Sequence, residues 1–147
     1  MRRFGYRQPN PRHQHRLQHK PRLNEAFRLL RKNGFIARQG FMCCMGCACV
    51  ALDALAKKRA EAGKPAKGIV YYHRQDAEYF EGGYKGTLMI RFMSPSDMDA
   101  DTAKVAQETI EIFTAAGVPT TWDQEIDHCI EVDLDVITEE SSTVSAV

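Results

Sequence analysis

Hydrophobic positions in the first half of the chain alternate between helical and strand periods. An apolar stripe at helical spacing follows Asn24, a residue type that favours helix N-caps, and ends at Asn33-Gly34. A strand, a long helix that stops before Gly63-Lys64-Pro65 and a β-branched, aromatic strand come next. The predicted ranges of these three elements are residues 35–41, 43–62 and 69–73.

The second half predicts one more helix and three more strands. Ser96 is the expected N-cap of the helix, whose apolar stripe ends before Gly117. The predicted strands are residues 87–92, 120–122 and 129–136. The order α-β-α-β-β-α-β-β predicts an α/β (α+β) fold, with one mixed sheet of about five strands and two to three packing helices. We expect this single domain over residues 23–137, between a basic flexible arm (residues 1–22) and a flexible tail (residues 138–147).

The composition bounds the location of the protein. The longest apolar run, residues 41–52, is shorter than the roughly 18–20 residues that cross a bilayer, so we expect no membrane span. There are five cysteines, an odd number, and four of them lie between Cys43 and Cys49. That crowding fits a reducing compartment better than a disulfide framework, so we expect a cytoplasmic protein.

Charge is distributed unevenly along the chain. Residues 1–40 contain 11 Lys and Arg but one acid, Glu25, whereas residues 41–147 contain 9 basic and 18 acidic residues. This polarity indicates either a polyanionic partner for the front, nucleic acid or an acidic protein, or pairing of the front with the acidic back of the same chain. The residues expected to contact a polyanionic partner are Arg2, Arg3, Arg7, Arg12, Arg16, Lys20 and Arg22.

Two polar clusters follow the first two predicted strands. A helix that connects consecutive strands by the usual right-handed crossover makes them parallel, so their carboxyl ends share one edge of the sheet, where ligand sites are favoured. Cysteines follow the first strand, and a histidine with two polar neighbours follows the second. The predicted pocket is lined by Cys43, Cys44, Cys47, His73, Gln75 and Asp76, with Arg38 and Gln39 nearby.

Four interpretations of these clusters remain open. Cys43, Cys44 and Cys47 are spaced to converge on zinc, with His73 or Cys129 as the fourth ligand. A strand–CxxC–helix order also suits thiol redox chemistry, although Pro95 follows the third strand instead of preceding a strand beside the thiols. A cysteine nucleophile with His73 as its base is the third interpretation. The fourth is structural: the cysteines act as small hydrophobes, and the polar residues satisfy backbone groups at a strand end.

Four motifs resemble those of an uncharacterised family of bacterial domains. They are F-x-A-R-Q-x-F-x-C-C-x-x-C, Y-H-x-Q-D, A-G-x-x-x-x-W-D and an alternating final strand, at residues 35–47, 72–76, 116–123 and 130–132. The resemblance implies a shared fold over roughly residues 23–135 but no activity. We therefore expect a small accessory, regulatory or interaction domain, more consistent with a binding role than with an enzyme; the alternative is a protein built around the cysteine site.

Overall fold

The computed structural model describes residues 21–81, 87–96 and 98–133. The predicted tail and all of the predicted arm except Pro21 and Arg22 lie outside these ranges. The described elements are α2 (Pro21–Lys32), β1 (Ile36–Arg38), α3 (Met45–Glu61), β2 (Ile69–Tyr71), α4 (Arg74–Glu81), β3 (Thr87–Met93), α5 (Asp99–Ala115), β4 (Thr120–Thr121) and β5 (Ile130–Asp133).

The strands form a single mixed sheet in the order β1-β2-β3-β5-β4. β1 and β2 are parallel, with Ile36 opposite Ile69, and the other three pairs are antiparallel. The predicted fold class and the predicted parallel pairing of the first two strands are both confirmed. Because β1 and β2 are parallel, the chain leaves both strands at the same edge of the sheet, the edge that holds their carboxyl ends.

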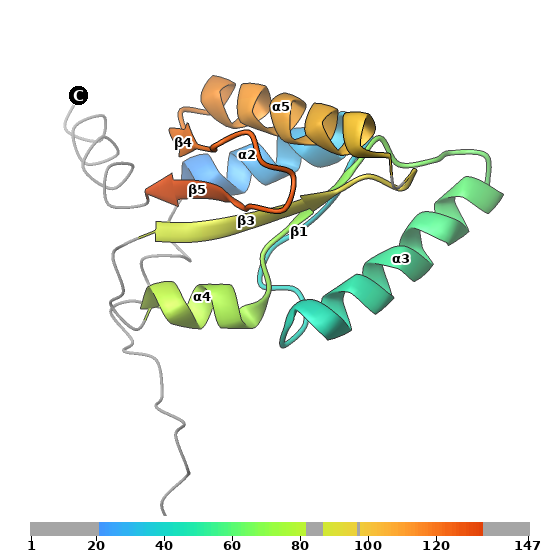
Figure 1. Ribbon diagram of the computed structural model, residues 1–147, viewed down its shortest axis with the longest axis horizontal. Helices are drawn as coiled ribbons and strands as arrows, with labels where there is room; N and C mark the ends of the chain where they lie inside the picture. Colours follow the sequence, from blue (N-terminus) through green and yellow to red (C-terminus); the bar gives the residue numbers. More distant parts are fainter. Residues whose placement is uncertain (1–20, 82–86, 97, 134–147) are drawn as a thin grey trace, which may run out of the picture.

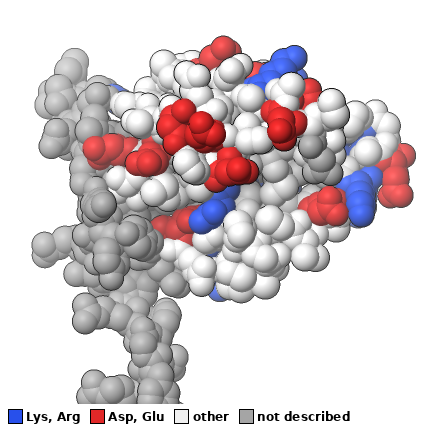
Figure 2. All heavy atoms as spheres, in the orientation of Figure 1, with Lys and Arg blue, Asp and Glu red and all other residues white. Residues whose placement is uncertain are grey.

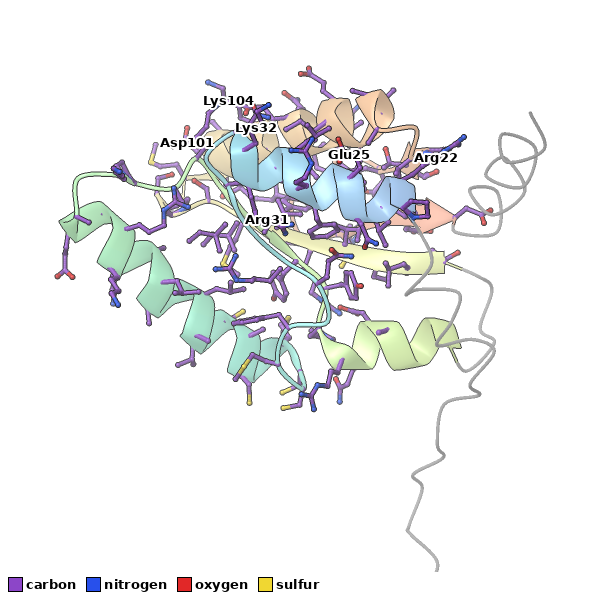
Figure 3. The ribbon with its side chains drawn as sticks, turned by 180° about the vertical axis from the view of Figure 1, so that it is seen from behind. Arg22, Glu25, Arg31, Lys32, Asp101 and Lys104 are labelled. Atoms are coloured by element: carbon purple, nitrogen blue, oxygen red, sulfur yellow. The ribbon has the colours of Figure 1, made fainter. Side chains whose placement is uncertain are left out.

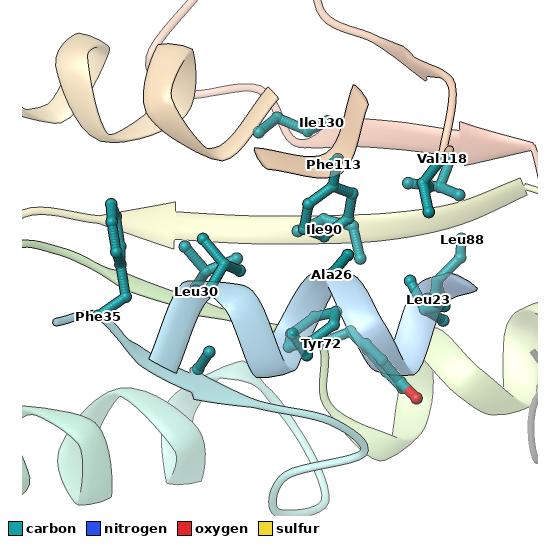
Figure 4. Packing of buried hydrophobic residues seen from close by; sticks show 14 of the residues in the cluster. Leu23, Ala26, Leu30, Phe35, Tyr72, Leu88, Ile90, Phe113, Val118 and Ile130 are labelled. Atoms are coloured by element: carbon teal, nitrogen blue, oxygen red, sulfur yellow. The ribbon is translucent and has the colours of Figure 1, made fainter. Parts of the chain in front are cut away.

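Helices cover both faces of this sheet (Figure 1). α2 and α5 pack side by side on one face, and α3 and α4 lie on the other. Under α2, the Phe27 ring packs edge-on against Tyr72 and Phe113, and the alternating apolar residues of β3 and β5 complete that core (Figure 4). A smaller core lies beneath α3, where Leu52 and Ala48 cover Ile36, Ile69 and Tyr71.

Three local features differ from the sequence-based prediction. α2 begins at Pro21, because the fixed φ of proline suits a first helical position, so Asn24 lies inside the helix and is not its cap. The N-cap of α5 is Met98; Ser96 instead tethers that helix, accepting a hydrogen bond from the Met98 N–H and donating one to Asp101. The third difference is α4, which lies between two predicted strands in a segment for which the sequence predicted neither a helix nor a strand.

The rear view shows how basic residues at the front of the domain are placed (Figure 3). Arg22, which was predicted to belong to the arm, lies at the start of α2 and packs its Cδ near Gly117. Arg31, near the other end of that helix, donates to the Ala37 carbonyl of edge strand β1 over 3.3 Å. Both residues therefore form part of the folded domain. No helix in the described ranges has the length and hydropathy needed to cross a bilayer.

Candidate functional site: a three-cysteine cluster

The segments that follow β1 and β2 stay in contact beyond the strands. The Phe41 N–H donates to the Tyr72 carbonyl and the Arg74 N–H to the Met42 carbonyl, each over 2.9 Å. Met42 has a φ of +63°, a left-handed conformation that is uncommon for a residue with a side chain. Two backbone hydrogen bonds thus hold the cysteine segment beside Tyr72 and Arg74, where the chain leaves β2 and enters α4.

Three cysteine sulfurs gather at the amino end of α3. Cys44 is the N-cap of this helix, and Cys47 lies three residues later, in the first turn of the same helix. The Cys43 Sγ is 3.7 Å from the Cys44 Sγ and 3.5 Å from the Cys47 Sγ, and all three sulfurs lie within 4.8 Å of one another. Cys43 and Cys47 are exposed and Cys44 is half-buried, so the cluster is open to solvent.

The surroundings of Cys44 and Cys47 shift the pKa values of these two thiols in opposite directions. The backbone N–H of Cys47 is the main cause that lowers the pKa of Cys44, followed by the neighbouring thiols of Cys43 and Cys47. The thiols of Cys43 and Cys44 in turn raise the pKa of Cys47 to about 11. Cys44 is therefore the thiol that ionises more readily, at the positive end of the helix dipole.

The spacing of the sulfurs suits a tetrahedral metal ion. Zinc–sulfur bonds of about 2.3 Å place two sulfurs of a tetrahedron about 3.8 Å apart. The two sulfur–sulfur distances that involve Cys43, 3.5 and 3.7 Å, are close to that value. Three of the four positions around a zinc ion can thus come from this turn of the chain. Within the described ranges, neither His73 nor Cys129 joins the group.

His73 and Asp76 form a reciprocal cap at the start of α4. The Asp76 N–H donates to His73 Nδ1 over 3.2 Å, and the His73 N–H donates to Asp76 Oδ2 over 3.1 Å. This is the arrangement of a capping box, with histidine in place of Ser or Thr and Asp in place of Glu. Both residues are buried, so each side chain satisfies a backbone group that water does not reach.

The cap determines the protonation state of His73. Nδ1 accepts a hydrogen bond, so we infer that the ring proton lies on Nε2 and that the imidazole is neutral. Burial lowers the pKa of His73, although the Asp76 charge opposes that change. The 3.3 Å approach of Nδ1 to the Asp76 carboxylate is for this reason better described as a neutral contact than as an ion pair.

Arg91 completes this buried group, and sequence reasoning did not identify it. Its Nε and Nη2 donate to Oδ2 and Oδ1 of Asp76, each over 3.0 Å, in a two-pronged ion pair. Burial alone would lower the pKa of Arg91, but the hydrogen bonds and charge of Asp76 outweigh it and raise the pKa. The Nη1 of Arg91 also lies 3.7 Å from the Met45 Sδ, in the first turn of α3. A charged residue inside the apolar strand β3 was the signal available in the sequence.

The other predicted pocket residues have partners elsewhere or face solvent. Gln39 donates to Asn24 of α2 over 3.1 Å and to the Tyr72 hydroxyl over 3.5 Å, and Arg38 donates to the Ala37 carbonyl over 3.1 Å. Gln75 is exposed at the start of α4. These contacts hold the two segments in place but do not bring the three side chains into the thiol group.

Cys129 lies apart from the cluster, in a cleft on the sheet face. The cleft has a volume of about 490 Å³ and is lined by Met89, Arg91, Trp122, Asp127, Cys129 and Glu131, among others. Figure 2 shows acidic side chains gathered over this face of the molecule. The Trp122 indole N–H donates to the carbonyls of Glu125 and His128, which holds the loop before β5 against the cleft. Burial raises the pKa of Cys129, so this thiol stays protonated near neutral pH.

Comparisons with known proteins assign the chain to a family without a described activity. Neither the curated proteins nor the solved structures yielded a match. A family described as a domain of unknown function, DUF6891, matches residues 13–136. That range contains the three clustered cysteines, the α4 cap and Arg91, and it confirms the expectation of an uncharacterised domain family. The chain therefore belongs to the DUF6891 family.

Proposed function

We propose that this protein is a non-enzymatic accessory domain that binds a thiophilic metal ion, with zinc as the first candidate. The observation that carries the proposal is the convergence of Cys43, Cys44 and Cys47 at the amino end of α3, with all sulfurs within 4.8 Å. Thiolates are the ligands that soft and borderline metal ions prefer over oxygen donors.

The local electrostatics support a bound cation held by thiolates. The α3 amino end lowers the pKa of Cys44 through the Cys47 backbone N–H, so one thiolate forms more easily there than on an exposed chain. A metal ion that binds this thiolate would then favour loss of the protons from Cys43 and Cys47. Metal binding is therefore expected to release protons and to weaken as the pH falls.

Thiol exchange is a second candidate, and one observation favours it. The pKa of Cys44 is lowered while that of Cys47 is raised to about 11, the unequal pair that an attacking and a resolving thiol require. This candidate predicts that oxidised glutathione produces an intramolecular disulfide between Cys44 and Cys47. A metal site instead predicts that bound zinc protects these thiols from that oxidation.

The metal proposal predicts one zinc ion per chain. The test is elemental analysis of the full chain purified under reducing conditions, followed by titration with cobalt as a spectroscopic probe. Cys44→Ser should weaken binding more than about 100-fold, because even changes behind the ligands cost 10–100-fold. Cys49→Ser is the matched control: Cys49 lies on the same helix, outside the sulfur group, and its Sγ is 3.6 Å from the Tyr71 hydroxyl. Equal metal content in both variants would contradict the proposal.

The basic front of the chain supports a separate proposal, contact with nucleic acid. Six of its seven predicted contact residues fall within residues 1–20, outside the described ranges, and Arg22 belongs to α2. Deleting residues 1–20 leaves α2 intact and should abolish most binding to a random-sequence oligonucleotide. If six phosphates are contacted, the full chain should lose about 1,000-fold in affinity between 50 and 200 mM salt. Unchanged binding after the deletion would refute this role.

A further inference from the structure

The three sulfurs lie among exposed side chains that are themselves uncharged. Residues 41–52 contain no charged side chain, and Met42, Met45 and Val50 are 40%, 52% and 74% exposed. We call this surface the thiol patch; its members are Met42, Cys43, Met45, Gly46, Cys47 and Val50. Large exposed apolar side chains that cluster around a functional group typically mark an interaction surface.

The cluster supplies fewer ligands than zinc requires. A zinc ion in a structural site takes four ligands, and the described part of the chain brings three sulfurs together. His73 already uses Nδ1 as an acceptor in the α4 cap, and Cys129 lies in the cleft over β3 and β5. The fourth position would face outward, because Cys43 and Cys47 are both exposed.

We propose that two copies of this chain associate through the thiol patch and share two zinc ions, each copy completing the other's coordination. The proposal rests on the metal-binding function argued above. Two tetrahedral ions need eight sulfur–metal bonds, and six thiolates provide them when two of the six bridge both ions. Each ion then has three sulfurs from its own chain and one from the second copy.

The geometry favours Cys43 as the bridging residue. Its sulfur is within 3.7 Å of both other sulfurs of the cluster, and its side chain is exposed. A bridging thiolate must remain next to the two terminal thiolates of its own chain while it reaches the second metal ion. The fourth ligand of each zinc is accordingly the partner's Cys43.

A second copy fits the thiol patch better than a partner with a charged surface. A twofold axis brings identical patches together, and because the side chains of the patch members are uncharged, they meet without like-charge repulsion. The Arg91 guanidinium lies beside Met45, where it is paired with Asp76. Cys47 and Val50 are three residues apart on α3, so they are neighbours on the helix surface and would be covered together. Six thiolates and two zinc ions carry a net charge of −2, which the amino ends of the two α3 helices stabilise.

The test measures the molar mass of the full chain by light scattering, with equimolar zinc and after chelation. We expect the mass to double with zinc, at one ion per chain, and to return to that of the monomer when zinc is removed. Val50→Glu places a charge in the patch without touching a ligand and should abolish the dimer. Ala60→Glu, at the exposed far end of α3, is the matched control and should leave it intact.

The outcomes separate this inference from the metal-binding proposal. One zinc per chain in a protein that stays monomeric would overturn the dimer and leave metal binding standing. A dimer that persists after chelation, or that Val50→Glu leaves unchanged, would also overturn it. Absence of zinc binding would refute both proposals.

Discussion

Replacing Arg91 by methionine should lower the free energy of unfolding by about 3 kcal/mol, because the Asp76 carboxylate would stay buried without its cation. The side chain of Asp76 is 6% exposed and that of Arg91 is 27% exposed, so water reaches the pair from one side only. This partial access places the expected loss at the low end of the roughly 3–5 kcal/mol range for a broken buried pair. Urea denaturation measures the change.

An exposed pair provides the matched control for this substitution. Arg28 also donates two hydrogen bonds to a carboxylate, that of Glu25, each over 2.7 Å, but both side chains are about half exposed. Arg28→Met should therefore lower the free energy of unfolding much less than Arg91→Met does, because exposed ion pairs contribute little to stability. Equal losses of unfolding free energy in the two variants would mean that burial of the Asp76–Arg91 pair has no energetic consequence, and would contradict this prediction.

The effect of Arg91 should extend to the cysteine segment. Asp76 accepts the His73 N–H in the α4 cap, and the next residue, Arg74, donates to the Met42 carbonyl. The guanidinium also contacts Met45. Loss of Arg91 should thus speed amide hydrogen exchange at Arg74 more than in the core strands, since local opening follows the loss of local contacts.

The fold was largely predictable because its strands bury apolar side chains in regular patterns. Ile69, Val70 and Tyr71 are β-branched or aromatic, and all three are buried in β2. The crossover rule then predicted the parallel pairing with β1, which places both polar clusters at one edge. Local sequence carried this information, so no knowledge of distant contacts was needed.

α4 was missed because its stabilising contacts are not local. The helix has eight residues, and its cap uses histidine, which is not among the preferred N-cap types. Its amino end is held by Arg91, which is 15 residues from Asp76 in the chain and lies on β3, the strand next to β2 in the sheet. A single sequence does not indicate which distant cation pairs with a given carboxylate.

The sequence likewise predicted one part of the candidate site and left the role of the other part open. Helical spacing predicted that Cys44 and Cys47 would meet, and their sulfurs lie in one group with that of Cys43. For His73 and Asp76, the sequence left open both a ligand role and a role in satisfying backbone groups. The structure gives both residues backbone partners, which depends on a capping geometry that residue types alone did not specify.

The core beneath α2 is separated from the thiols by the sheet. Phe27 is fully buried there, with ring centroids 5.9 Å from Tyr72 and 5.6 Å from Phe113. The cysteines lie on α3, which packs over the smaller core on the other face. A substitution in the larger core should therefore change global stability without changing the metal ligands.

Phe27→Ala should cost about 3–5 kcal/mol, because it removes a buried ring and leaves a cavity between Tyr72 and Phe113. Domains of this size have total stabilities of about 5–15 kcal/mol, so the loss should appear as a large shift of the urea midpoint. Phe27→Leu fills more of the space and should cost less. At low temperature, where the Ala variant stays folded, zinc content should equal that of the parent chain. A fall in zinc content without unfolding would show that the two faces are coupled, against the separation argued from their packing.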